Sequence, residues 1–279
     1  MNKILIPTDL SANSLKALEY GLDMASKYGG KIILLNVYFL ADMNARQPIL
    51  KEMNDAVIRV GENKNFPIIT GEEKEDFPES DPSAVFCEMA VRQGFAEEEI
   101  MNVAIQKEVD LILMGTHGAS GLRYILFGSS TAEVIEKSEH PVLAIPPEGK
   151  FEPIERVSYA TDLKDEKDPA IGQLIRFIRY WGAALQMVNV RSPREEPNID
   201  SLQGIAESIS DHHDLEDVLF FEEEAENAIK GLTNHIQNQR PNILAMTTQH
   251  RYFFQKLTRA SHTKKMVLEG NTPVLAFHR

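Results

Sequence analysis

The stretch MGTHGASGLRYILFGSS, residues 114–130, carries four glycines, at positions 115, 118, 121 and 128, and ends in two serines. The apolar letters DLIL before it predict a strand, and STAEVIEKS at its end predicts a helix. Glycine loses more conformational entropy on folding than any other residue, so this segment gives up stability for another purpose. We interpret the glycines as places where bare backbone comes close to a ligand between a strand and a helix.

The strand end and the helix start together favour an anion as that ligand. In open parallel sheets, ligands lie beyond the carboxyl ends of the strands, and Gly115 is predicted to stand at such an end. Gly128 precedes Ser129 and Ser130, and a helix start offers free N–H groups and the positive end of its dipole to phosphate. Two simpler explanations stay open: the glycines only form turns, and Ser130 with Glu133 forms a capping box.

The chain contains two copies of one plan. TDL occurs at residues 8–10 and 161–163, and NV at residues 36–37 and 189–190, so the Asp-to-Asn separation is 27 in both copies. Later, HPVLAI and TPVLAF align at an offset of 132 instead of 153, so the first copy has 21 additional residues in its middle. A length of 279 residues also suggests two domains. We predict domains at residues 1–147 and 151–279, joined by the proline-rich PPEGKFEP.

Each copy alternates predicted strands and helices. In the first copy, apolar runs predict strands at residues 3–7, 31–38, 84–91, 110–115 and 141–145, and three- and four-residue spacing predicts helices at 11–29, 96–108 and 130–138. This alternation is typical of an α/β fold with a parallel sheet and helices on both faces. Residues 41–83 are acidic and poorly periodic past Gly61, so we predict one short helix and then a surface loop at residues 62–83, without chemistry.

Charge and cysteine content exclude several classes of function. A net charge of −13 and a pI near 5.1 argue against binding to nucleic acid or to an anionic membrane surface. The single cysteine, Cys87, excludes an intrachain disulfide and a CxxC metal site, and we interpret it as an apolar filler of a strand. The longest apolar run, residues 32–41, is about half a membrane span, and the first residues lack the pattern of a signal peptide. We therefore expect a cytoplasmic protein.

The spacing Gly115-x-x-Gly118, nine residues, then Gly128–Ser129 resembles the signature of ATP-binding universal stress proteins. ILIPTDLS at residues 4–11 and HPVLAIP at residues 140–146 add to the resemblance, which covers essentially the whole chain as a tandem pair. It implies two tandem Rossmann-like domains, each a three-layer α/β/α sandwich with a five-stranded parallel sheet. It also implies ATP at the carboxyl ends of the strands and dimer formation through the last strand.

The resemblance assigns roles to individual residues. Asp9 would contact adenine or ribose, with Pro7 and Thr8 shaping the wall, and Val37 would recognise adenine through its backbone groups. Ribose and phosphates would be lined by Met114, Gly115, His117 and Gly118. The β- and γ-phosphates would be held, with Mg²⁺ between them, by Gly128, Ser129 and Ser130. From chemistry alone, Asp9 also fits a helix N-cap, and His117 also fits a packing residue.

The second copy departs from this pattern. Gly115, Gly118 and Gly128 correspond to Thr247, His250 and Ala260, whereas Asp162, Val190 and Ser261 persist. We expect the second copy not to bind ATP in the usual way, because side chains replace the bare backbone. A relaxed site using Arg251, Lys256 and Arg259 stays open, as does a metal at His212 and His213, although both groups fit a solvated surface better.

Three functions remain on this reading. The first is a nucleotide-binding stress regulator that is not an enzyme or hydrolyses ATP only weakly, since the sequence has no Walker lysine. The second is a slow ATPase or nucleotidyl-transferring enzyme on the same site. The third is a scaffold that binds another small ligand, a metal or a lipid, in the second domain. The apolar strands PVLAIP and PVLAFHR are expected to pair with each other within one chain, and a homodimer stays open.

Overall fold

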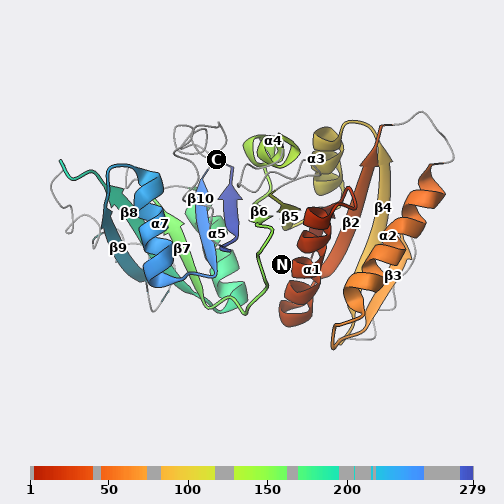
Figure 1. Cartoon of the computed structure of the whole chain (residues 1–279), viewed down its shortest axis with the longest axis horizontal. Coiled ribbons are helices and arrows are strands. Elements are labelled where there is room, and N and C mark those ends of the chain that lie inside the picture. Colours follow the sequence, from red (N-terminus) through yellow and green to blue (C-terminus); the bar gives the residue numbers. More distant parts are fainter. Residues whose placement is uncertain are drawn as a thin grey trace. The chain divides into compact units, whose positions relative to one another are not determined.

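A computed structural model describes residues 3–39, 45–73, 83–116, 129–161, 169–194, 204, 215, 218–247 and 271–278. The chain forms two compact units that separate between Phe151 and Glu152 along the backbone (Figure 1). Each unit has its own parallel sheet and its own helices.

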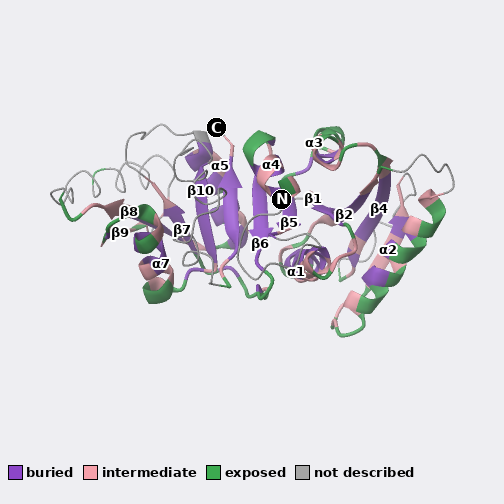
Figure 2. Ribbon diagram, turned by 45° about the horizontal axis from the view of Figure 1, so that its top comes forward, coloured by how far each residue is buried: buried purple, intermediate pink, exposed green. Residues whose placement is uncertain are grey.

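The sheet of the first unit is entirely parallel and six strands wide in the described residues. Its order is β3-β4-β2-β1-β5-β6. The strands are β1 (Lys3–Pro7), β2 (Lys31–Tyr38), β3 (Ile68–Glu72), β4 (Val85–Gln93), β5 (Leu111–Gly115) and β6 (Val142–Ile145). The central strands read as continuous apolar runs because helices cover both of their faces, and Figure 2 shows them buried along their length.

Four described helices form the outer layers of this unit: α1 (Ala12–Tyr28), α2 (Arg46–Gly61), α3 (Ala96–Gln106) and α4 (Ser129–Lys137). Helix α1 packs on β1, β5 and α2, whereas α3 packs on β2 and α4. The chain crosses from β1 to β2 in one direction and from β4 to β5 in the other. Because parallel crossovers are right-handed, α1 and α3 therefore cover opposite faces of the sheet.

The second unit repeats this arrangement. Its order, β11-β10-β7-β8-β9, corresponds strand for strand to β6-β5-β1-β2-β4. The strands are β7 (Arg156–Ala160), β8 (Ala184–Arg191), β9 (Val218–Glu224), β10 (Ile243–Thr247) and β11 (Val274–Phe277), and the described helices are α5 (Pro169–Trp181) and α7 (Ala228–Gln239). The predicted fold class and the internal repeat are confirmed.

The middle of the first copy differs from its prediction. Helix α2 is 16 residues long, not short, and β3 adds a sixth strand to the five that were expected. The letters IITGE were missed because β3 is a half-buried edge strand, which lacks both a continuous apolar run and strict alternation. Residues 74–82 of the predicted acidic loop lie outside the described residues.

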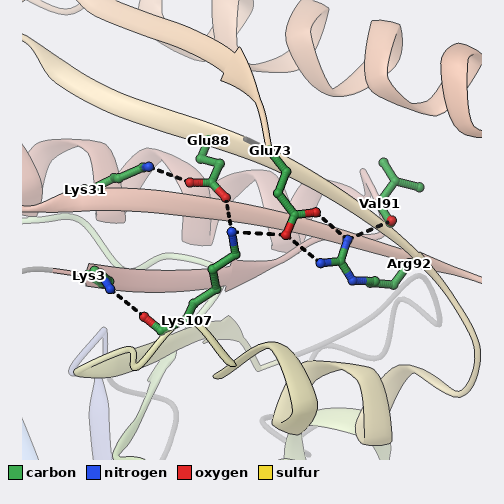
Figure 3. Close-up of polar contacts among 7 residues, drawn as sticks. All are labelled: Lys3, Lys31, Glu73, Glu88, Val91, Arg92 and Lys107. Carbon is green, nitrogen blue, oxygen red and sulfur yellow. Dashed lines mark hydrogen bonds and ion pairs between the residues drawn. The ribbon is translucent and has the colours of Figure 1, made fainter. Parts of the chain in front are cut away.

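A chain of ion pairs fixes β3 and β4 to the end of α3 (Figure 3). Glu73, which follows β3, accepts two hydrogen bonds of 2.7 Å from the Arg92 guanidinium at the end of β4. Lys107 lies between Glu73 and Glu88, at 3.0 and 2.7 Å, and Lys31 contacts the other oxygen of Glu88 at 2.5 Å. Because each of these charges meets an opposite one, we interpret the cluster as a structural link.

Candidate functional site

The loop after β1 is held by its own hydroxyl groups. The Thr8 N–H donates to the carbonyl of Leu35 in β2 (2.8 Å), and the Thr8 hydroxyl oxygen accepts from the N–H of Leu10 (3.0 Å). The hydroxyl of Ser14 lies 3.0 Å from that of Thr8. These contacts fix the backbone through Leu10, whose φ of 61° is in the left-handed region. The loop therefore presents Asp9 in one conformation.

Asn36 locks the same loop from the neighbouring strand. Its side-chain amide donates to the carbonyl of Thr8 (2.8 Å) and is buried. The second unit repeats the contact, since Asn189 donates to the carbonyl of Thr161 (2.9 Å). Sequence reasoning used the NV dipeptide only to align the copies and missed this role, although its recurrence at a fixed distance from TDL was an available signal.

Asp9 is exposed at the carboxyl edge of the sheet. Its Oδ1 accepts from the N–H of Ser11 (3.0 Å). Desolvation raises the pKa of Asp9, but hydrogen bonds from Ser11 and Ser14 outweigh it, so the net pKa is lowered and the carboxylate stays charged. The alternative role as N-cap is wrong, because Ser11 is the N-cap of α1 and accepts from Ser14.

Val37 presents its peptide groups beyond the end of β1, the strand that Asp9 follows. Strand β1 pairs with β2 only as far as Pro7, opposite Leu35. Alternate residues of a strand in a parallel ladder bond to the same neighbour. Val37, two residues beyond Leu35, therefore directs its N–H and C=O toward the side on which β1 has already ended. This edge can serve a ligand that offers one donor and one acceptor.

Gly115 ends β5 next to the start of α1. A Cβ atom placed on Gly115 would lie 2.6 Å from the carbonyl oxygen of Asn13. Packing within the protein is thus one reason for this glycine, and the approach of a ligand to its backbone stays a prediction. Met114, beside it, is buried and pairs with Ala144 of β6. The hydroxyl of Thr131 in α4 donates to the Gly115 carbonyl (2.9 Å), so the helix start is anchored to the strand end.

The first turn of α4 carries the two predicted serines. Ser129 is exposed, whereas the Ser130 hydroxyl donates to the Oε1 of Glu97 in α3 (2.5 Å). The capping-box alternative is wrong, because Ser130 lies within the helix and Glu133 pairs with Lys137. The predicted residues His117, Gly118 and Gly128 lie outside the described residues.

The described part of the predicted site lies along one edge of the sheet. Pro7, Thr8 and Asp9 follow β1, Val37 ends the neighbouring β2, and Met114 and Gly115 end β5 on the other side of β1. The start of α4 is tied to β5. The edge thus combines the Asp9 carboxylate, the Val37 peptide groups beyond the end of β1 and a helix N-terminus, which suits a ligand with a polar planar part and an anionic part.

The donors at this edge fit a divalent cation only in part. Within the described ranges, no group of three or more His, Cys, Asp or Glu side chains could hold a metal ion. Mg²⁺ is usually bound by one or two carboxylates together with substrate phosphates and water. Glu97 of α3, which accepts from Ser130 at the start of α4, is a carboxylate of that kind, so a cation that arrives with phosphates fits these residues.

The second unit keeps the residues at the ends of the first two strands of this edge and replaces Gly115. Asn189 donates to the Thr161 carbonyl as Asn36 does to that of Thr8, and Val190 stands where Val37 does. Thr247, in place of Gly115, is buried at the end of β10. The counterparts of Asp9 and of the two later glycines, Asp162, His250 and Ala260, lie outside the described residues, as do His212 and His213.

The second unit also has a buried polar cluster that the sequence did not reveal. The Ser158 hydroxyl donates to the side-chain carbonyl of Gln186 (2.8 Å), and His235 Nε2 lies 2.8 Å from the hydroxyl oxygen of Ser158. Because the serine proton is committed to Gln186, Nε2 carries the imidazole proton. Nδ1 is then bare, 3.5 Å from a carboxylate oxygen of Glu223. The aligned residues of the first unit are the buried Leu5, Ile33 and Val103.

Desolvation lowers the pKa of His235 to about 4 and raises that of Glu223. The cluster lies within the core, with Ser158 and His235 fully buried, so it offers no surface to a substrate. We interpret it as part of the packing of the second unit.

The fold defines an α/β protein with parallel sheets, a class in which ligands usually lie beyond the carboxyl ends of the strands. Residues 1–146 match the model of the universal stress protein family. The chain belongs to that family.

Individual relatives agree with this assignment. Universal stress protein MJ0577 of Methanocaldococcus jannaschii is 30% identical over 159 residues, which are 51% of this chain and 93% of the relative. YxiE of Bacillus subtilis is 27% identical over 152 residues, 52% of this chain and 98% of the relative. Each of these relatives is therefore matched nearly whole by half of this chain.

A solved structure resembles both halves together. A universal stress protein from Archaeoglobus fulgidus matches 100% of this chain and 96% of its own, with a TM-score of 0.66 and 22% identity. At that identity the likeness shows the fold alone. Every described helix is too short or too polar to cross a lipid bilayer.

Proposed function

We propose that the chain is an ATP-binding stress regulator that holds one adenine nucleotide in its first domain, residues 1–147. The observation that carries the proposal is the edge formed by Asp9 and Val37. The Asp9 carboxylate, held by Ser11, follows β1, and beyond the end of β1 the Val37 peptide groups offer one donor and one acceptor, as the edge of an adenine base requires. Family membership and the glycine motif add a phosphate position at the other end.

Each predicted residue has a physical role in this proposal. Val37 bonds the base through its peptide, and Asp9 accepts from a ribose hydroxyl or a base amine, with Pro7 and Thr8 as the wall. Ribose and phosphates pass over Met114, Gly115, His117 and Gly118. The terminal phosphates, with Mg²⁺, reach the start of α4 at Gly128, Ser129 and Ser130, where helix N–H groups and the dipole stabilise negative charge.

The proposed site binds without fast chemistry. The sequence lacks the GxxxxGK[ST] pattern whose lysine contacts the transferred phosphate in P-loop enzymes. The described carboxylates at this edge, Asp9 and Glu97, are engaged with Ser11 and Ser130 rather than poised on a water or nucleophile. We therefore expect nucleotide occupancy, and not turnover, to be the signal.

Incubation of the purified chain with ATP and Mg²⁺ tests this proposal. Binding should be saturable, and phosphate release should stay below about one equivalent per minute, far under typical enzyme turnover. Release of many equivalents per minute, lost in Gly128→Val, would favour the slow ATPase or nucleotidyl transferase. No binding of any adenine nucleotide would favour the scaffold.

For the second domain, residues 151–279, we propose a degenerate site that does not take ATP in the usual way. Thr247 fills the position of Gly115, and the other two motif glycines are replaced by His250 and Ala260. The hydrogen bond from Asn189 to the Thr161 carbonyl supports this proposal, because it holds the end of β7 whether or not a ligand is bound.

We also propose that the last strand of each half, β6 and β11, supplies the family's dimer contact within one chain. Both strands, VLAI and VLAF, are fully apolar, and such edges are prone to pair. Light scattering should then give the mass of one chain, 31.4 kDa. Twice that mass would favour the homodimer.

A further inference from the structure

One of the proposed hydrogen-bond donors to phosphate, the Ser130 hydroxyl, already donates to a carboxylate. The Ser130 hydroxyl donates to Glu97 Oε1 at 2.5 Å, although the two residues are 33 positions apart. Glu97 lies in the first turn of α3, which packs against α4. The contact therefore joins two helix starts at the place where the terminal phosphates of a nucleotide would arrive.

This contact opposes a bare anion in two ways. A serine hydroxyl has one proton to donate, so Ser130 cannot serve Glu97 and a phosphate oxygen at the same time. The carboxylate also repels a phosphate that approaches within a few ångströms, and partial burial weakens the screening of that repulsion. Free triphosphate thus meets both a blocked donor and a like charge.

A divalent cation removes both obstacles. Mg²⁺ is commonly shared between one or two protein carboxylates and the phosphate oxygens of a substrate. A cation placed between Glu97 and the phosphates turns the like-charge contact into shared ligation. The Ser130 proton is then released from Glu97 and can be donated to a phosphate oxygen.

We propose that Glu97 makes the nucleotide site of the first domain selective for cation-complexed triphosphate over free triphosphate. This inference rests on the proposed nucleotide binding of that domain. The second copy is consistent with it, because Ile229 stands at the position of Glu97 in the copy that has lost the glycines. The carboxylate therefore accompanies the motif rather than the fold.

Calorimetric titration of the full chain with ATP, in Mg²⁺ and separately in EDTA, tests the inference. The wild type should bind about tenfold or more tightly in Mg²⁺, the order expected for relief of a partly desolvated charge contact. In EDTA, Glu97→Gln should bind ATP more tightly than the wild type does. Its affinities for ATP in Mg²⁺ and in EDTA should therefore be close to each other. The matched control is Glu98→Gln, at the exposed next position of the same turn, and it should keep the wild-type ratio.

The gain of affinity in EDTA is the decisive result, because a damaged fold would not produce it. The inference would be overturned if Glu97→Gln kept the wild-type ratio of ATP affinity in Mg²⁺ to ATP affinity in EDTA. It would also be overturned if the substitution weakened ATP binding equally in both solutions. Either result would leave the proposed nucleotide binding standing. A wild type that binds ATP in neither solution would overturn the proposed function, and this inference with it.

Discussion

At the scale of single residues, Asn36 shows how a side chain outside the predicted site positions it. Its amide holds the Thr8 carbonyl, and Asn189 does the same for Thr161 in the second unit. Asn36→Ala leaves a buried carbonyl without this donor, so we expect a loss of about 1–3 kcal/mol in the free energy of unfolding, measured with urea.

The same substitution separates stability from ligand binding. Asn36→Ala should also weaken ATP binding, because the loop that carries Asp9 is released. Asn189→Ala is the matched control: it should cost similar stability and leave ATP affinity unchanged. Equal ATP affinity in the two variants would show that the loop lock does not position a ligand.

Gly115 allows a second test of the packing. Gly115→Ala places a methyl group 2.6 Å from the Asn13 carbonyl, so the backbone must shift at a cost of about 1–3 kcal/mol in stability. In contrast, Gly172→Ala in α5 meets no atom within 4 Å and should stabilise the chain by about 0.5–1 kcal/mol. Thermal unfolding measures the stability of both variants. If Gly115→Ala were as stable as the wild type, the packing explanation would be contradicted.

At this scale the sequence singled out individual residues but did not reveal the partners that the structure gives them. Glycine at 115 and serine at 130 stand out from the spacing alone. Their contacts, Asn13 and Glu97, come from other elements, and no local pattern connects residues so far apart. The sequence therefore suggested a ligand next to Gly115 but not the neighbouring backbone that also requires a glycine there.

At the scale of elements, the ion-pair network explains why the edge strand β3 stays attached. Hydrogen bonds from Arg92, ahead of the contribution of Lys107, lower the pKa of Glu73 to about 2 from 4.5. A carboxyl group with a depressed pKa stabilises the folded state fully above 4.5, and this stabilisation is lost as the pH falls toward 2.

Hydrogen exchange of the β3 amides follows this loss directly. Protection of β3 should fall between pH 4.5 and 2, by up to about 3 kcal/mol in opening free energy. Glu73→Gln should lower the protection already at pH 6 and flatten its dependence on pH. Glu133→Gln, in an exposed ion pair of α4, serves as control and should change neither. Unchanged β3 protection in Glu73→Gln would argue against the network as the link.

Elements with strong periodicity were predicted well, and weak ones were not. The buried strands and α1 follow from apolar runs and three- and four-residue spacing. Strand β3 is different, because its stability comes from pairing with β4 and from Glu73, neither of which its five letters display. Contacts with distant residues, and not its own sequence, make this segment a strand.

At the scale of the whole molecule, two copies of one fold have different cores. The second unit places Ser158, Gln186 and His235 where the first has aliphatic side chains. Desolvation lowers the pKa of His235 to about 4, below its ordinary 6.5. Its contribution to stability is therefore complete above pH 6.5 and is lost as the pH falls toward 4.

The single tryptophan, Trp181, lies buried in α5 and reports on the second unit alone. Urea unfolding followed by its fluorescence should show a loss of up to about 3 kcal/mol between pH 6.5 and 4. His235→Gln, which keeps a donor for Ser158 without titrating in this range, should reduce that slope. The neighbouring Glu223 has a raised pKa, so its contribution to stability increases as the pH falls, opposite to that of His235. Glu223→Gln removes this contribution and allows the two to be separated. A slope unchanged in His235→Gln would exclude this histidine as its source.

The central claim is that the first copy binds a nucleotide and the second does not, and calorimetric titration of the intact chain with ATP and Mg²⁺ tests it most directly. Gly128→Val and Ala260→Val change the matching positions of the two copies. We predict that one ATP binds per chain and that this binding is lost in Gly128→Val and retained in Ala260→Val. Two ATP per chain, or binding that survives Gly128→Val and disappears in Ala260→Val, would contradict it.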